Sequence, residues 1–115
     1  MGKFNSFEEI NSWQKARQFN KRVYEITDNQ NFKRDFDLVR QIRRASISIS
    51  SNIAEGFELQ SNKQFVKFLY ISKGSSGEVR SLLKICEELN IVIFFCTYYS
   101  SSFDISPKID PLYIF

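Results

Sequence analysis

The feature that most constrains the fold is an apolar repeat at helical spacing between residues 38 and 53. Its members recur every three or four positions and so share one side of a helix: Leu38, Ile42, Ala45, Ile49 and Ile53. Three arginines fall on the opposite side: Arg40, Arg43 and Arg44. We therefore predict a helix over about 36–56 with one packed face and one basic face.

A strand is the competing interpretation of the same stretch. Residues 46–50 read SISIS and alternate with period two, as a half-buried strand does. The helix is favoured because its spacing holds over the longer window and no second strand is available for pairing. In the helix, Ile47 lies among the arginines, where an exposed apolar residue would suit a subunit contact.

Capping signals predict two further helices, at about 7–27 and 62–89. Ser6 with Glu9 and Ser61 with Gln64 each match a capping box, in which two side chains satisfy free backbone N–H groups. Asp35 or Asp37 can cap the middle helix. Polar residues 28–34 form a predicted loop, and Gly56 is expected to end or bend the middle helix. The prediction is an all-α domain of three helices over residues 1–90.

The residue composition changes after Asn90. Residues 91–103 are β-branched and aromatic, and Pro107 and Pro111 prevent a long helix to the end. Residues 91–115 are therefore expected to be a divergent tail in place of a fourth helix.

Composition excludes most catalytic and metal chemistry. The net charge is +3 and histidine is absent, which removes the usual general base and the common nucleophile and di-iron arrangements. We expect no enzymatic activity, no cofactor, no metal and no small-molecule substrate. Cys86 and Cys96 lack CxxC spacing and suggest free thiols. With no apolar run near the roughly 20 residues of a spanning helix, the expectation is a soluble, cytoplasmic protein without a membrane partner.

The arginines of the middle helix are the candidate binding residues. Guanidinium groups on consecutive turns can hold phosphates, with affinity that falls as salt rises. The alternative is a solvated face, or pairing with acids such as Asp37. Further basic residues could extend the nucleic-acid-binding surface: Lys15, Lys21 and Arg22.

A second group of residues suggests structure more than binding. Asn52, Glu55 and Gly56 lie near the predicted turn between the second and third helices, where the polar pair could bond freed backbone groups. The alternative for Asn52 and Glu55 is a ligand or partner contact. Trp13 belongs to the first helix and is assigned to the same structural set.

Several motifs, in order, resemble the bacterial four helix bundle protein family, also described as encoded by intervening sequences in 23S rRNA genes. The matching segments are WQKA at 13–16, QIRRA at 41–45, SISSNIAEG at 48–56, and KGS at 73–75 with Glu78. The resemblance implies an antiparallel, up-and-down helical bundle of four helices, often assembled as a ring-shaped homopentamer with a positively charged surface. It implies no enzymatic activity. The chain also resembles the accessory protein of diversity-generating retroelements, which implies association with nucleic acid.

The chain departs from the family at its end, where the family's charged fourth helix is absent. We hypothesise a truncated or out-of-frame ending. A Glu/Lys-rich helix encoded in another frame after Asn90 would support this hypothesis, and its absence would count against it.

The expected function is that of a non-enzymatic, oligomeric protein associated with structured RNA through its basic helix face. The alternative is an assembly or scaffold protein that binds a protein partner through exposed apolar residues such as Ile47 and Phe57.

Overall fold

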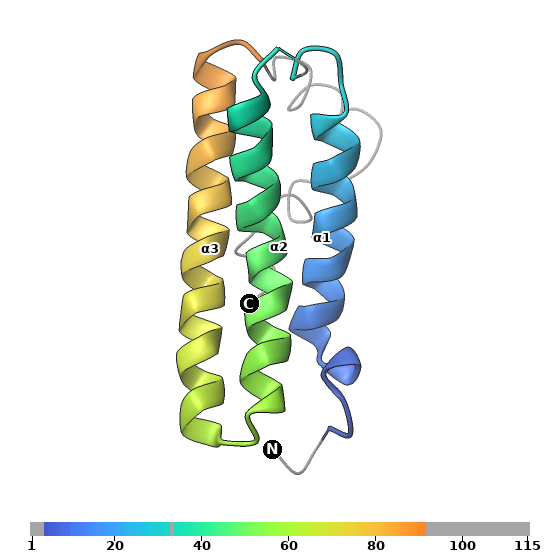
Figure 1. The fold of residues 1–115 in the computed structure, drawn as a ribbon, viewed down its shortest axis with the longest axis vertical. Helices are drawn as coiled ribbons and strands as arrows, with labels where there is room; N and C mark the ends of the chain where they lie inside the picture. Colours follow the sequence, from blue (N-terminus) through green and yellow to red (C-terminus); the bar gives the residue numbers. More distant parts are fainter. Residues whose placement is uncertain (1–3, 33, 92–115) are drawn as a thin grey trace.

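A computed structural model describes residues 4–32 and 34–91 as three long helices after a short turn. The elements are the 3-10 turn η1 (Phe7–Glu9) and the helices α1 (Asn11–Thr27), α2 (Phe36–Glu58) and α3 (Asn62–Glu88). The helices run up, down and up, with α2 between α1 and α3 (Figure 1). No strand occurs in these ranges, so the all-α prediction is confirmed and the strand over 46–50 is excluded.

The first helix begins later than predicted. The Ser6 side chain makes no capping bond, and the Glu9 carboxylate accepts from the backbone N–H of Asn5 at 3.0 Å. Ile10 adopts an extended conformation and is buried, while Phe7 stacks edge-on against Trp13 at 5.1 Å between ring centroids. Burying Ile10 and docking Phe7 therefore replace the first helical turn with η1.

The other two helices begin where their caps predict. The Asp35 carboxylate accepts from the N–H of Leu38 at 3.0 Å. The Ser61 hydroxyl accepts from the N–H of Gln64 at 3.4 Å. Both bonds satisfy donors that a helix start leaves without an intrahelical partner.

Gly56 does not break α2, which corrects the prediction. The helix continues to Glu58, and Gln60, at φ 53°, makes the turn into α3. Gly56 is buried, and a Cβ added there would lie 2.6 Å from the Cβ of Phe68. The glycine thus lets α2 and α3 approach closely. The third helix ends at Glu88, one residue before the predicted end.

The two apolar residues expected on the surface have different environments. Ile47 is 40% exposed on the basic side of α2, as predicted. Phe57 is only 4% exposed and packs edge-on against Phe65 at 6.3 Å between centroids. The prediction that Phe57 is exposed was wrong because α2 extends past Gly56 and keeps Phe57 on the packed face.

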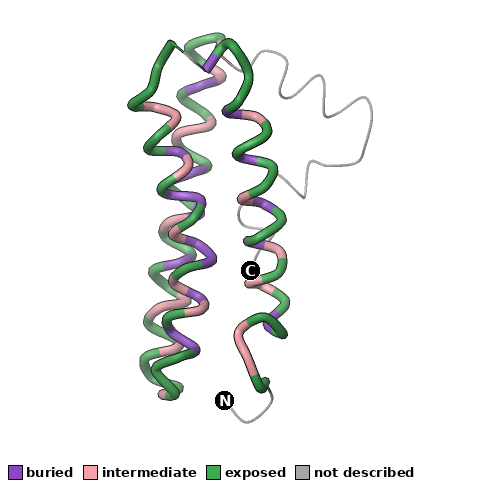
Figure 2. The backbone as a smooth tube through the Cα atoms, turned by 45° about the vertical axis from the view of Figure 1, so that its right-hand side comes forward, coloured by how far each residue is buried: buried purple, intermediate pink, exposed green. Residues whose placement is uncertain are grey.

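Buried residues recur along the sides where the helices face one another (Figure 2). The predicted stripe of α2 supplies much of the core, with Ile42, Ile49 and Ile53 fully buried. Serines lie beside them: the Ser72 hydroxyl donates to the carbonyl oxygen of Ile49 at 2.7 Å. In the part of the chain that the structure describes, every buried side-chain N or O atom has a hydrogen-bond partner. The helix seams are therefore polar yet satisfied within the chain.

Cys86 is a free thiol in this core, as predicted. Burial raises the pKa of the Cys86 thiol to about 11, with a further contribution from the Asp35 carboxylate. The thiol is therefore neutral at physiological pH and a poor nucleophile. Cys96, the divergent tail and the fourth-helix prediction lie outside the described residues.

Within residues 4–32 and 34–91, no helix combines the length and the apolar character needed to cross a bilayer.

Candidate nucleic-acid interface

Arg43 joins α2 to the end of α1. Its Nε donates to the Thr27 hydroxyl at 2.8 Å, and its Cζ lies 4.4 Å from the centroid of the Tyr24 ring. The Thr27 hydroxyl in turn donates to the carbonyl oxygen of Val23 at 2.7 Å. Arg43 is half-buried and makes its contacts within the chain, so it acts first as a brace between two helices.

Arg40 and Arg44 differ from Arg43 because both are exposed on the outer side of α2. Among the described residues, no ion pair or hydrogen bond of either guanidinium is found, including with Asp37. Each guanidinium carries five N–H donors in a planar fork that matches a phosphate. These two residues are the part of the basic face that is free to meet a ligand.

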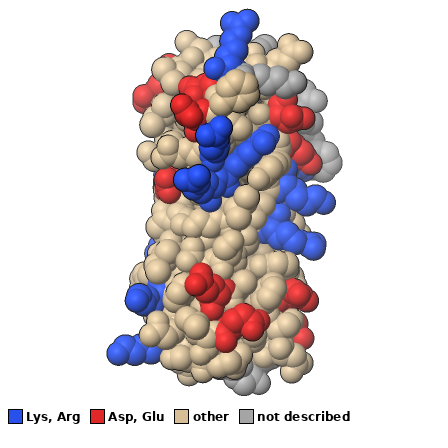
Figure 3. All heavy atoms as spheres, viewed as in Figure 1, with Lys and Arg blue, Asp and Glu red and all other residues tan. Residues whose placement is uncertain are grey.

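A space-filling view shows how charge is distributed on this face. Basic side chains gather over the upper part of α2 and over neighbouring α1, with acidic side chains above and beside them, and further acidic side chains lie on the lower part of the same face (Figure 3). In the sequence of α2, the arginines lie in the first half together with Asp37, and Glu55 and Glu58 lie at the end.

The lysines and arginine of α1 divide between two sides of that helix. At 100° per residue, Lys21 lies about 60° from Tyr24 around α1, whereas Lys15 and Arg22 lie about 160–180° away. Arg22 pairs with Glu25 at 3.1 Å. The structure therefore places Lys21 on the side of α1 that adjoins Arg43, and it places Lys15 and Arg22 on the far side.

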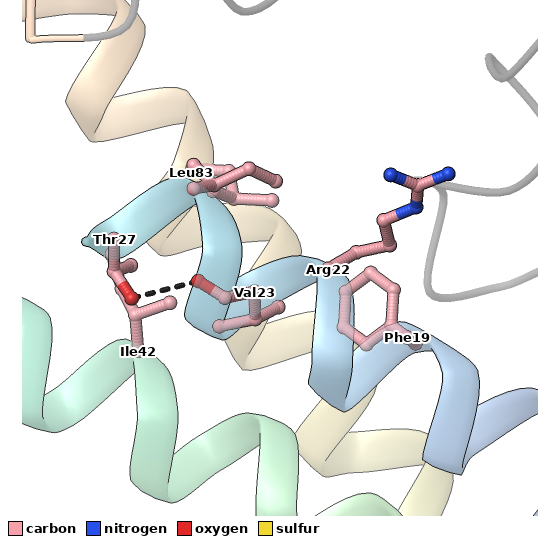
Figure 4. A pocket seen from close by; sticks show the side chains of 7 residues that line it. Phe19, Arg22, Val23, Thr27, Ile42 and Leu83 are labelled. Carbon is pink, nitrogen blue, oxygen red and sulfur yellow. Dashed lines mark hydrogen bonds between the residues drawn. The ribbon is translucent and has the colours of Figure 1, made fainter. Parts of the chain in front are cut away.

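Arg22 instead lies beside a small void between the three helices (Figure 4). The void has a volume of about 10 Å³, near the size of one water molecule. Its other lining residues are mainly apolar: Phe19, Val23, Ile26, Thr27, Ile42 and Leu83. The Thr27 hydroxyl is already bonded to Val23, as the dashed line shows, so the void is a packing gap and not a ligand site.

Sequence reasoning missed a groove beside the arginines. It has a volume of about 460 Å³, and its lining consists of three arginines and four apolar or aromatic residues: Arg40, Arg43, Arg44, Tyr24, Phe36, Val39 and Ile47. Phe36 is 72% exposed. The spacing of Phe36, Arg43 and Ile47, seven and then four positions, already placed them on one helix face, but the contribution of Tyr24 needed the tertiary structure.

The residues assigned to a structural set are not equivalent. Asn52 donates to the carbonyl oxygen of Ser48 at 2.7 Å and contacts its hydroxyl at 2.9 Å, and the Ser48 hydroxyl bonds that of Ser75 at 2.9 Å. Asn52 thus supports the α2–α3 seam from within α2. Glu55 is exposed, and its carboxylate has no hydrogen bond or ion pair among the described residues.

Metal ligands do not gather in residues 4–32 and 34–91, where no group of three or more Asp, Glu, Cys or His side chains could hold an ion. What the basic face can do chemically is attract and orient anions by charge and by N–H donation.

Comparison with known proteins assigns most of the chain to one family. The model of the 23S rRNA-intervening sequence protein family matches residues 8–93, which include all three helices and the arginine-bearing segment. Neither a curated protein nor a solved structure was matched. Because the match covers most of its length, the chain belongs to the 23S rRNA-intervening sequence protein family.

Proposed function

We propose that this protein is a non-enzymatic, self-associating helical protein of the cytoplasm that binds structured RNA through the basic face of α2. The observation that carries the proposal is the state of Arg40 and Arg44, which are exposed and have no ion-pair partner among the described residues. Lys21 would extend this surface along α1. Arg43 would hold the two helices in register and present its remaining N–H groups.

The binding mechanism would be electrostatic and largely independent of sequence. Phosphate contacts position a protein on nucleic acid without reading its bases. Each contact releases counterions, so affinity should fall steeply with salt. The family description, which refers to 23S rRNA, is compatible with RNA as the partner.

Self-association would multiply a modest charge. One chain carries only +3, so several copies presenting the same arginines would gain avidity. Apolar side chains exposed along α3 support such an assembly: Val66, Tyr70, Ile71 and Ile85. Native mass spectrometry of the full chain should show an oligomer, with a pentamer as the specific expectation. A monomer at micromolar concentration would contradict the avidity argument.

The direct test is RNA binding by charge-matched variants. Fluorescence anisotropy with a 23S rRNA fragment, at two salt concentrations, would compare the native chain with Arg40→Gln/Arg44→Gln. We expect the double variant to bind more weakly and to show a salt slope smaller by about 1–2. The matched control is Lys67→Gln/Arg80→Gln, which removes two exposed charges from α3. Equal losses in both variants, or binding that does not respond to salt, would contradict the proposed site.

A scaffold that binds a protein partner is the second candidate. The exposed apolar side chains on α3 favour it, as does Ile47 on α2. A chain that binds no RNA at low salt, yet loses a partner when Tyr70 is replaced by Ala, would favour the scaffold over the RNA-binding protein.

A further inference from the structure

The groove between the end of α1 and the first half of α2 contains more than a phosphate site requires. Its volume of about 460 Å³ falls within the roughly 300–1,000 Å³ of small-ligand sites. Four of its lining side chains are apolar or aromatic: Tyr24, Phe36, Val39 and Ile47. A surface that served only to attract phosphates would have no need of an exposed phenylalanine ring.

The Phe36 ring lies next to the guanidiniums of Arg40 and Arg44 because of the helical spacing of the three residues. Phe36 and Arg40 are four residues apart on α2, and so are Arg40 and Arg44, so each pair lies on consecutive turns of one face. Phe36 is the first residue of α2 and 72% exposed, so most of its ring is open to a ligand. Tyr24 differs because the Arg43 guanidinium already lies over its ring.

This pairing distinguishes among nucleic-acid shapes. A continuous A-form duplex presents phosphates and 2′-hydroxyls on its surface and keeps its bases stacked inside. An unpaired nucleotide presents both a phosphate and an open base face, and bases stack on aromatic side chains with little regard to sequence. Phe36 beside Arg40 therefore suits an unpaired nucleotide, whereas a continuous duplex would make no use of the Phe36 ring.

The same pattern fits an apolar partner helix less well. Such a helix would need a continuous apolar stripe to dock against. Here Arg40 and Arg43 lie between Phe36 and Ile47 on the same face, so the partner would bury guanidiniums that form no ion pair among the described residues.

We propose that this groove binds an unpaired nucleotide of RNA, with the phosphate held by Arg40 and Arg44 and the base stacked on Phe36. The inference rests on the proposed RNA-binding function and narrows it from structured RNA in general to bulges, loops and single strands. Phe36 determines the preference for unpaired nucleotides, and the arginines supply affinity for all RNA.

The test compares three RNA probes of equal length and charge with the native chain and Phe36→Ala. The probes are a single strand, a hairpin closed by a non-nucleotide linker so that every nucleotide is paired, and a single strand whose central nucleotides are abasic. The native chain should bind the intact single strand most tightly. Phe36→Ala should weaken that binding by about tenfold, the size expected for loss of one base–aromatic stack. It should leave hairpin binding and abasic-strand binding unchanged.

Phe4→Ala is the control because it removes another exposed aromatic ring, 39% exposed, from the segment that precedes η1. Circular dichroism and native mass of both variants establish that fold and assembly are retained. If Phe4→Ala causes the same loss as Phe36→Ala, the groove is not the site and the inference is overturned.

Failure of the inference can be told apart from failure of the proposed function. In one outcome, hairpin and single strand bind equally and with salt dependence, and this binding is weakened by Arg40→Gln/Arg44→Gln but not by Phe36→Ala. That outcome would overturn the nucleotide site in the groove and leave the proposed RNA binding intact. Absence of salt-dependent binding to any probe would overturn both. Binding of an acidic helical peptide in place of all three RNA probes, lost in Phe36→Ala, would assign the groove to a protein partner and overturn the inference.

Discussion

The two sides of α2 handle polar groups in opposite ways. On the side that faces α3, Ser72 bonds the backbone of Ile49, and Ser48 joins Asn52 to Ser75. On the outer side, Arg40 and Arg44 project from the surface without an ion pair among the described residues. We call the side that faces α3 the closed side, because its polar groups are bonded within the chain. The outer side is the open side, because its guanidiniums are available to a ligand.

The difference shows which polar residues of α2 belong to the fold. Buried hydroxyls and amides must be bonded, because an unsatisfied buried group costs about 1–3 kcal/mol. Exposed guanidiniums carry no such requirement, since water solvates them. Substitutions along α2 should therefore separate into those that change stability and those that change binding.

The largest expected effect separates two isoleucines two positions apart. Ile49 is fully buried and Ile47 is 40% exposed. Ile49→Ala should lower the free energy of unfolding by about 2–5 kcal/mol, from lost burial and the cavity left behind. Ile47→Ala should cost less than about 1 kcal/mol. Urea unfolding followed by circular dichroism measures both, and equal losses would remove the distinction between the closed and open sides.

The next largest effect is a change in stability that has opposite signs at Gly56 and Gly74. Gly56→Ala forces a Cβ to within 2.6 Å of Phe68 and should destabilise by about 1–3 kcal/mol despite the better helix propensity of alanine. Gly74→Ala meets nothing within 4 Å and should stabilise by about 0.5–1 kcal/mol. Thermal unfolding at matched concentration tests the pair. Stabilisation by both substitutions would mean that α2 and α3 do not approach closely at Gly56.

The neighbouring residues Arg43 and Arg44 of α2 should also differ in their effects on stability and on RNA binding. Arg43→Gln removes the bond to Thr27 and the contact with Tyr24, and should cost about 1 kcal/mol. Arg44→Gln should leave the free energy of unfolding within about 0.5 kcal/mol while weakening RNA binding. Chemical denaturation and anisotropy on the same samples sharpen the comparison. A large loss of stability in Arg44→Gln would show that its guanidinium has an internal role.

The smallest effect concerns the pair near the end of α2. Asn52→Ala breaks bonds to Ser48 and should cost about 1 kcal/mol. Glu55→Ala should change stability by less than about 0.5 kcal/mol, because the Glu55 carboxylate has no bond among the described residues. Differential scanning calorimetry distinguishes these values. A Glu55→Ala variant that melts as early as Asn52→Ala would support the structural role first expected for both residues.

Much of the fold followed from local patterns. Apolar spacing placed α2 and its two faces, and the caps at Asp35 and Ser61 placed two helix starts, because these signals act within one or two turns. The start of α1 was predicted wrongly, because Ile10 is extended and buried in the core and the helix begins only at Asn11. The effect of Gly56 was also predicted wrongly. Glycine often ends a helix, but here it lies within α2 and allows α3 to pack closely against it.

The sequence by itself determined three amphipathic helices and the arginines on the outer face of α2, because periodicity and capping are properties of neighbouring residues. Only the tertiary structure decided which arginine is used internally, since Arg43 meets Thr27 and Tyr24 through the packing of α1 on α2. It also decided that Lys21, and not Lys15 or Arg22, lies on the groove side of α1. Contacts between residues far apart in the chain depend on how the helices are rotated against each other, and no local pattern specifies that rotation.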